Sequence, residues 1–75
     1  MERNLIIHGR KFIGYVLDRM QGRGITISVV EDIIKTGRRI SSYMNRIRYY
    51  SDADKISVIT EHDGTVVSVV RGVVK

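Results

Sequence analysis

Four side chains with proton-exchanging or cationic groups recur near the start of the chain at the spacing of one helical face. His8, Lys11, Tyr15 and Arg19 follow one another at intervals of three or four residues, and such residues lie on the same side of a helix. If a helix extends back to His8, this side would border a groove able to hold a phosphate and move protons. We therefore take His8, Lys11, Tyr15 and Arg19 as candidates for the edge of a cleft, with Lys11 as a candidate RNA-binding residue. The same spacing also fits solvated surface charges, with Tyr15 covering the margin of the core.

A second cluster interleaves arginines with tyrosines. The arginines are Arg38, Arg39, Arg46 and Arg48, and the tyrosines are Tyr43, Tyr49 and Tyr50. Guanidinium groups bind phosphates, and aromatic rings stack on bases. Arg46, Arg48, Tyr49 and Tyr50 are therefore candidate RNA-binding residues, and so is Arg23. Ordinary exposed sheet faces also carry such side chains, and Arg23 could equally stabilise the end of a helix.

Ser68 is a hydroxyl residue among valines near the end of the chain. It stands in phase with Val66 and Val70 in a pattern of alternating residues. If this phase faces the core, the hydroxyl needs a hydrogen-bond partner. If it faces the open side of a sheet, Ser68 could contact a phosphate.

The composition favours a function without a metal ion, and we expect no cofactor. Cysteine is absent and only two histidines occur, far apart, so thiol catalysis and cysteine zinc sites are excluded and a histidine-rich metal site is not expected. No glycine-rich phosphate loop or known hydrolase motif occurs. Thirteen Lys and Arg residues against eight Asp and Glu give a formal net charge of +5. This balance favours a polyanionic partner.

The apolar pattern of the first half predicts two helices within a single domain that covers residues 1–75. No apolar run approaches the roughly 20 residues that cross a bilayer, so we expect no membrane-spanning segment. Apolar spacing between Phe12 and Met20 predicts the first helix, which should end at the glycines of residues 21–24. A second helix should begin at Ser28, which has capping-box spacing with Glu31, or at the competing N-cap Thr26, and it should stop at Gly37.

The second half changes to the two-residue period of β-strands. Strands are expected near residues 46–50, 56–59 and 66–70, with a polar turn at 51–54 and a hairpin at Asp63-Gly64. Residues 38–42 could form a fourth short strand. The sequence therefore predicts an α+β domain with two N-terminal helices packed on one face of a three- to four-stranded antiparallel sheet. The other face would be partly open to a polyanion.

The order of several short motifs resembles one group of bacterial toxins. The motifs are LDRMQGRGIT (17–26), SVVE (28–31), KTG (35–37), YYSDA (49–53), ISVIT (56–60) and GTVVSV (64–69). Over about residues 12–72, the chain resembles C-terminal toxin domains of contact-dependent growth-inhibition and other polymorphic toxin systems. Within these it is similar to the group with the barnase/EndoU/colicin/RelE-like ribonuclease fold.

This resemblance implies a metal-independent RNA endonuclease that commonly cleaves tRNA by attack of the ribose 2′-hydroxyl. Such domains are exported as part of a larger bacterial toxin and act in the cytoplasm of the target cell. A cognate immunity protein neutralises them in the producing cell, and we expect that protein to be acidic because the domain is basic.

One departure from the family pattern leaves the activity open. Arg19 and Ser68 match the family's helix arginine and strand hydroxyl, so the resemblance makes them candidate catalytic residues. Tyr15 stands where many relatives carry a histidine, and His8 and Tyr15 are the further catalytic candidates. Either His8 takes over the histidine's role, or Tyr15 assists by hydrogen bonding, or the activity is weak or lost. In the last case the chain is a non-catalytic RNA-binding or protein-interaction module. The sequence predicts no oligomeric state, although a free sheet edge is a place for pairing.

Overall fold

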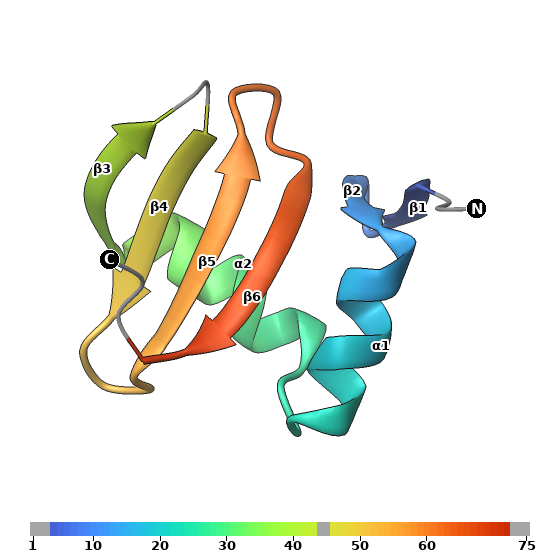
Figure 1. Cartoon of the computed structure of the whole chain (residues 1–75), viewed down its shortest axis with the longest axis horizontal. Coiled ribbons are helices and arrows are strands. Elements are labelled where there is room, and N and C mark those ends of the chain that lie inside the picture. The colour runs from blue at the N-terminus through green and yellow to red at the C-terminus, as the bar shows by residue number, and fades with distance from the viewer. Residues whose placement is uncertain (1–3, 44–45, 73–75) are drawn as a thin grey trace.

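The protein folds into two helices and one mixed sheet of six strands (Figure 1). The computed structural model describes residues 4–43 and 46–72. The strand order in the sheet is β1-β2-β6-β5-β4-β3. In chain order the elements are β1 (Asn4–Ile7), β2 (Arg10–Ile13), α1 (Gly14–Gly22), α2 (Ile27–Thr36), β3 (Arg38–Tyr43), β4 (Arg46–Ser51), β5 (Ile56–Glu61) and β6 (Val66–Arg71).

A hairpin precedes both helices. β1 and β2 pair antiparallel through a two-residue turn in which His8 and Gly9 have φ values of 52° and 80°. Turns of this length use positive φ, which glycine adopts at low cost. β2 then meets β6 in parallel register at Phe12 and Val66, and both side chains are fully buried.

α1 follows β2 directly and buries Val16 and Met20 in the core. The helix ends at the predicted glycines: Gly24 has a φ of 69°, and the Ile25 N–H donates to the Met20 carbonyl at 2.9 Å. Glycine in this conformation is the usual way to close a helix. α1 begins later than its apolar pattern suggested, because Phe12 belongs to β2.

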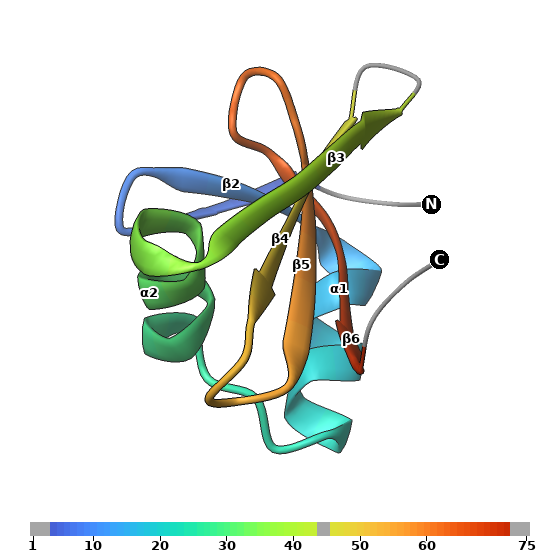
Figure 2. The same ribbon diagram turned by 90° about the vertical axis from the view of Figure 1, so that its left-hand side faces the viewer.

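α2 covers one face of the sheet. Thr26 caps its start, with the side-chain oxygen accepting from the Val29 N–H at 3.2 Å, an arrangement that stabilises helices by about 1 kcal/mol. Val30 and Ile33 are buried in one core cluster with Val58 of β5. Figure 2, which views the sheet nearly edge-on, shows α2 on one side of β3, β4 and β5.

β3 to β6 form the antiparallel meander that the alternating pattern predicted, including the fourth strand. The β4–β5 turn is closed by Ser51, whose hydroxyl accepts from the Asp54 N–H at 3.0 Å. The β5–β6 hairpin lies at the predicted place, but its loop spans residues 62–65. A tight two-residue turn does not form, because Asp63 accepts from the Thr65 N–H at 2.9 Å and only Gly64 of the predicted pair has positive φ.

The predicted arrangement of the α+β domain is wrong. A hairpin comes before the helices, and the sheet has six strands with one parallel contact in place of three or four antiparallel strands. The helices also do not share one face: α1 packs against β2 and β6, whereas α2 packs against β4 and β5. The four residues spaced like a helical face do not share one. His8 lies in the hairpin turn and Lys11 in β2, and only Tyr15 and Arg19 belong to α1.

Gly37→Ala should lower the free energy of unfolding by about 1–3 kcal/mol, the usual cost of overpacking. A Cβ atom at Gly37 would lie 2.5 Å from the Ile33 carbonyl oxygen and 3.0 Å from that of Tyr50. Gly22→Ala is the matched control, because nothing lies within 4 Å of its added Cβ. As the last residue of α1, it should raise stability by up to about 1 kcal/mol. Urea unfolding followed by circular dichroism measures both, and equal effects would contradict the steric argument.

Candidate functional site

A row of side chains crosses the face of the sheet that α2 leaves uncovered. Arg48 of β4 lies opposite Ile59 of β5, and Ile59 lies opposite Ser68 of β6. Directly opposite residues in antiparallel strands share a face. Tyr49 and Val58, which pack with the α2 side of the core, are the next residues along and point the other way. Arg48, Ile59 and Ser68 therefore belong to the open face.

α1 reaches the β6 end of this row. The Tyr15 hydroxyl donates to the Val67 carbonyl at 3.4 Å, and that carbonyl belongs to the peptide bond preceding Ser68. The Arg19 guanidinium carbon lies 5.6 Å from the centroid of the Tyr15 ring, within range of a cation–π interaction. We call Tyr15, Arg19 and Ser68 the α1–β6 corner.

The orientation of α1 agrees with this placement. Leu17 and Gln21, on one flank of its buried stripe, line a hollow with Ile27 at the start of α2. Tyr15 and Arg19 lie on the opposite flank of the same stripe, because successive residues are rotated by about 100°. They therefore border the side of the β6 edge that faces away from α2.

The corner offers groups suited to a phosphate. Ser68 is half-buried, and among the described residues no hydrogen bond involves its hydroxyl. Arg19 is exposed on α1 next to the Tyr15 ring, whose hydroxyl reaches the carbonyl before Ser68. Arg48 stands two strands away from Ser68, at about 10 Å given the usual strand spacing. Arg48 is half-buried and already engaged in an interaction. A phosphodiester at Ser68 would thus lie between two cationic side chains.

The two tyrosines of β4 point to opposite faces. Tyr49 packs against the core beneath α2, whereas Tyr50 belongs to the open face and is only 7% exposed. Arg38 of β3 covers Tyr50, with its guanidinium carbon 5.9 Å from the ring centroid, and also pairs with Asp52 at 2.9 Å. Neither ring is therefore presented to a base in the way the sequence suggested. Arg46 is exposed at the far end of β4.

Arg23 has a structural role. Its Nη1 donates to the Val69 carbonyl at 2.8 Å, and the Arg71 Nη2 donates back to the Arg23 carbonyl at 2.5 Å. In the described residues β2 pairs with β6 only at Phe12 and Val66. The side chains of Tyr15 and Arg23 thus supply partners for carbonyls further along the edge.

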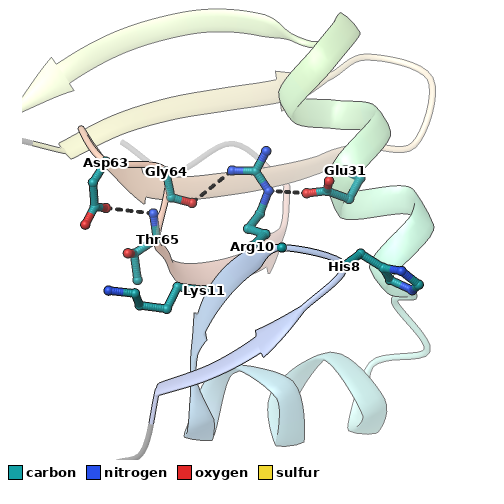
Figure 3. Close-up of a pocket in the computed structure, with 8 residues that line it drawn as sticks. His8, Arg10, Lys11, Glu31, Asp63, Gly64 and Thr65 are labelled. Atoms are coloured by element: carbon teal, nitrogen blue, oxygen red, sulfur yellow. Dashed lines mark hydrogen bonds and ion pairs between the residues drawn. The ribbon is translucent and has the colours of Figure 1, made fainter.

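His8 and Lys11 lie in a different region, a polar pocket of about 490 Å³ between the first hairpin, α2 and the β5–β6 loop (Figure 3). Figure 3 shows their side chains pointing in different directions, with His8 next to α2. Arg10 connects the three walls of this pocket. Its Nε donates to the Glu31 carboxylate of α2, and its Nη1 donates to the Gly64 carbonyl of the β5–β6 loop at 2.9 Å. The pocket of Figure 3 and a second hollow that His8 lines beside α2 contain no residue of the α1–β6 corner.

Arg10 and Glu31 were missed as site residues because they lie 21 positions apart and no local pattern links them. Glu31 was assigned to a capping box with Ser28, whereas Thr26 caps α2 and leaves the carboxylate to Arg10. Arg38 belongs to the arginine–tyrosine cluster of the sequence but was not chosen as a candidate RNA-binding residue.

The described residues contain no obvious metal centre, and neither helix is suited to a bilayer. No group of three or more His, Cys, Asp or Glu residues in that part of the chain could hold a metal ion. Neither of its helices has the length and apolar character needed to cross a membrane.

Comparison with known proteins yields no relative. No family model, curated protein or solved structure matches this chain. The resemblance to toxin domains therefore stays a prediction.

Arg23→Ala should lower the free energy of unfolding by about 1–3 kcal/mol, because the Val69 carbonyl loses its charged donor. Arg19→Ala removes the same charge from the same helix end but only a ring contact, so it should cost less than about 1 kcal/mol. Urea unfolding of the two variants gives the comparison. A loss of stability for Arg19→Ala as large as that for Arg23→Ala would contradict a structural role for Arg23 at the edge of β6.

The pKa of Asp63 is lowered below 3.8, chiefly because the carboxylate accepts from the Thr65 N–H and also because Lys11 lies nearby. The stability that this carboxylate contributes is present above its unfolded pKa and is lost as pH falls through the lower folded value. An NMR titration should show the Asp63 carboxyl and the Thr65 amide shifting together, with a midpoint below 3.8. A midpoint at or above that value would contradict the hydrogen bond.

Proposed function

We propose that this protein is an RNA endonuclease domain that works without a metal ion, with the α1–β6 corner as its active site. One observation carries the proposal: Tyr15 of α1 bonds to the carbonyl before Ser68, about 50 residues further along the chain, and Arg19 lies next to the Tyr15 ring. The net charge of +5 supports a polyanionic substrate.

The chemistry needs only groups of the types found at this corner. The ribose 2′-oxygen attacks phosphorus, the bond from phosphorus to the 5′-oxygen breaks, and a 2′,3′-cyclic phosphate remains. Arg19 would hold the charge that builds up on the phosphoryl oxygens, and Ser68 would donate to one of these oxygens. Tyr15 would donate a proton to the leaving 5′-oxygen, while the proton of the 2′-hydroxyl passes to water.

The second candidate is RNA binding without cleavage. The position of His8 favours it, because His8 lines the pocket of Figure 3 and not the corner. Histidine is the side chain best suited to exchange protons near neutral pH. Without one at the corner, the arginines of the open face would still hold a phosphate backbone.

The more specific expectations rest on the resemblance to toxin domains. They are tRNA as the substrate, an acidic immunity protein as the partner, and delivery by a larger bacterial toxin into the cytoplasm of a target cell. An immunity protein of this kind would cover the open face and compete with RNA for its arginines.

Incubation of the purified protein with total bacterial RNA in EDTA tests the proposed cleavage. Discrete fragments ending in 2′,3′-cyclic phosphate are expected on a denaturing gel. Arg19→Ala should slow their formation by about 100- to 1000-fold, the usual loss when one donor to a developing charge is removed. Arg39→Ala is the matched control, because Arg39 lies opposite Tyr49 and so on the face that α2 covers.

The outcomes separate the two candidates. RNA that is bound but never cut by the natural sequence would overturn the nuclease proposal and leave the binding module. Cleavage that appears only in Tyr15→His would show a corner with the right geometry but no proton acceptor. RNA that is neither bound nor cut would contradict both candidates.

Arg48→Gln should weaken binding of a labelled tRNA by roughly 3- to 10-fold and flatten the dependence of affinity on salt, since each phosphate contact adds to that slope. Arg39→Gln removes the same charge from the other face and should change affinity less than about twofold. Fluorescence anisotropy between 50 and 200 mM salt, roughly the range over which such contacts weaken, measures both. Thermal melts establish that Arg48→Gln stays folded, and equal effects of the two variants would contradict binding on the open face.

A further inference from the structure

The two outer strands of the sheet differ in how well they resist pairing with another strand. β3 carries exposed Arg38 and Arg39 and a register shift between Arg39 and Ser41. Charges and bulges of this kind are common protections against edge-to-edge pairing. β1, at the opposite edge, has four residues, none of them charged, and pairs with β2 without a register shift.

Two apolar side chains of β1, Leu5 and Ile6, are exposed. Ile6 is 69% exposed and Leu5 is 43% exposed, the former being the most exposed large apolar side chain in the described part of the chain. Leu5 and Ile7 point to one face of the hairpin and Ile6 to the other, because side chains alternate along a strand. β1 therefore offers a free row of backbone groups with apolar side chains on both faces.

A second copy of the same strand is complementary to this edge. Two antiparallel strands related by a two-fold axis normal to the sheet place one residue opposite its own copy. With Ile6 on the axis, Leu5 of each copy lies opposite Ile7 of the other. Every pair among Leu5, Ile6 and Ile7 is then apolar. β1 has no charged side chain, so the pairing brings no like charges of this strand together. That matters because the two chains repel each other, each with a formal net charge of +5.

We propose that the protein self-associates through antiparallel pairing of β1 with β1 of a second copy, with Ile6 on the two-fold axis. The inference does not depend on RNA binding or cleavage. It also has the opposite salt dependence: salt screens the repulsion between two basic chains and strengthens the dimer, whereas it weakens contacts with phosphates.

A single cysteine tests the register directly, since the natural chain has none. Ile6→Cys should yield a disulfide-linked dimer under mild oxidation, because the two sulfurs would face each other across the axis. Ile40→Cys is the control: Ile40 is exposed to 43% on the protected edge strand β3 and should remain largely unlinked. Non-reducing gels at several protein concentrations report both, and equal cross-linking of the two variants would overturn the proposal.

Sedimentation equilibrium of the natural sequence tests the association itself. We expect a monomer–dimer equilibrium that shifts toward dimer as salt rises, and Ile6→Lys should raise the dissociation constant at least about tenfold. Ile40→Lys should leave the constant within about twofold, and circular dichroism establishes that both variants are folded. A protein that stays monomeric at all concentrations, or a dimer unaffected by Ile6→Lys, would contradict pairing at β1. A dimer detected only after adding a different protein would do so as well.

Discussion

The largely unpaired edge of β6 is the constraint on which the arrangement of this small domain depends. β5 pairs along one side of β6, and within the described ranges β2 pairs with the other side only at Phe12 and Val66. The backbone carbonyls along the rest of this edge are part of a buried strand and need hydrogen-bond partners. Tyr15 and Arg23 supply them for Val67 and Val69. α1 is therefore held along the β6 edge, away from the faces of the sheet.

This placement also makes the candidate site. Because α1 lies beside β6, one flank of the helix borders the open face. There the Tyr15 hydroxyl bonds to the carbonyl before Ser68, and Arg19 lies over the Tyr15 ring. α2 meanwhile covers the other face with Val30 and Ile33. Strand alternation then separates the basic side chains, so that Arg39 lies on the covered side and Arg48 on the open side. A helix packed over the open face would have hidden these groups.

The contacts around Arg10 explain why the two regions of polar side chains stay apart. Arg10 bonds to Glu31 of α2 and to Gly64 of the β5–β6 loop, and so fixes the first hairpin across the end of the sheet. His8, at the tip of that hairpin, is held next to α2. The functional interpretation follows from this geometry: the corner contains cationic and hydroxyl groups, while the histidine nearest in sequence belongs to another pocket.

Local features were readable from the sequence because their causes lie within a few residues. Thr26, Gly24 and Gly37 mark helix ends through capping and turn conformation, and alternation located the strands from Arg46 onward. The sequence also determined the basic charge and the residue types of the corner. Only the tertiary structure decided that residues 4–13 form a hairpin, that α1 lies on an edge, and that His8 stays away from Arg19. Those outcomes depend on contacts between distant segments, such as Arg10 with Glu31 and Arg23 with Val69, and periodicity within one segment carries no information about them.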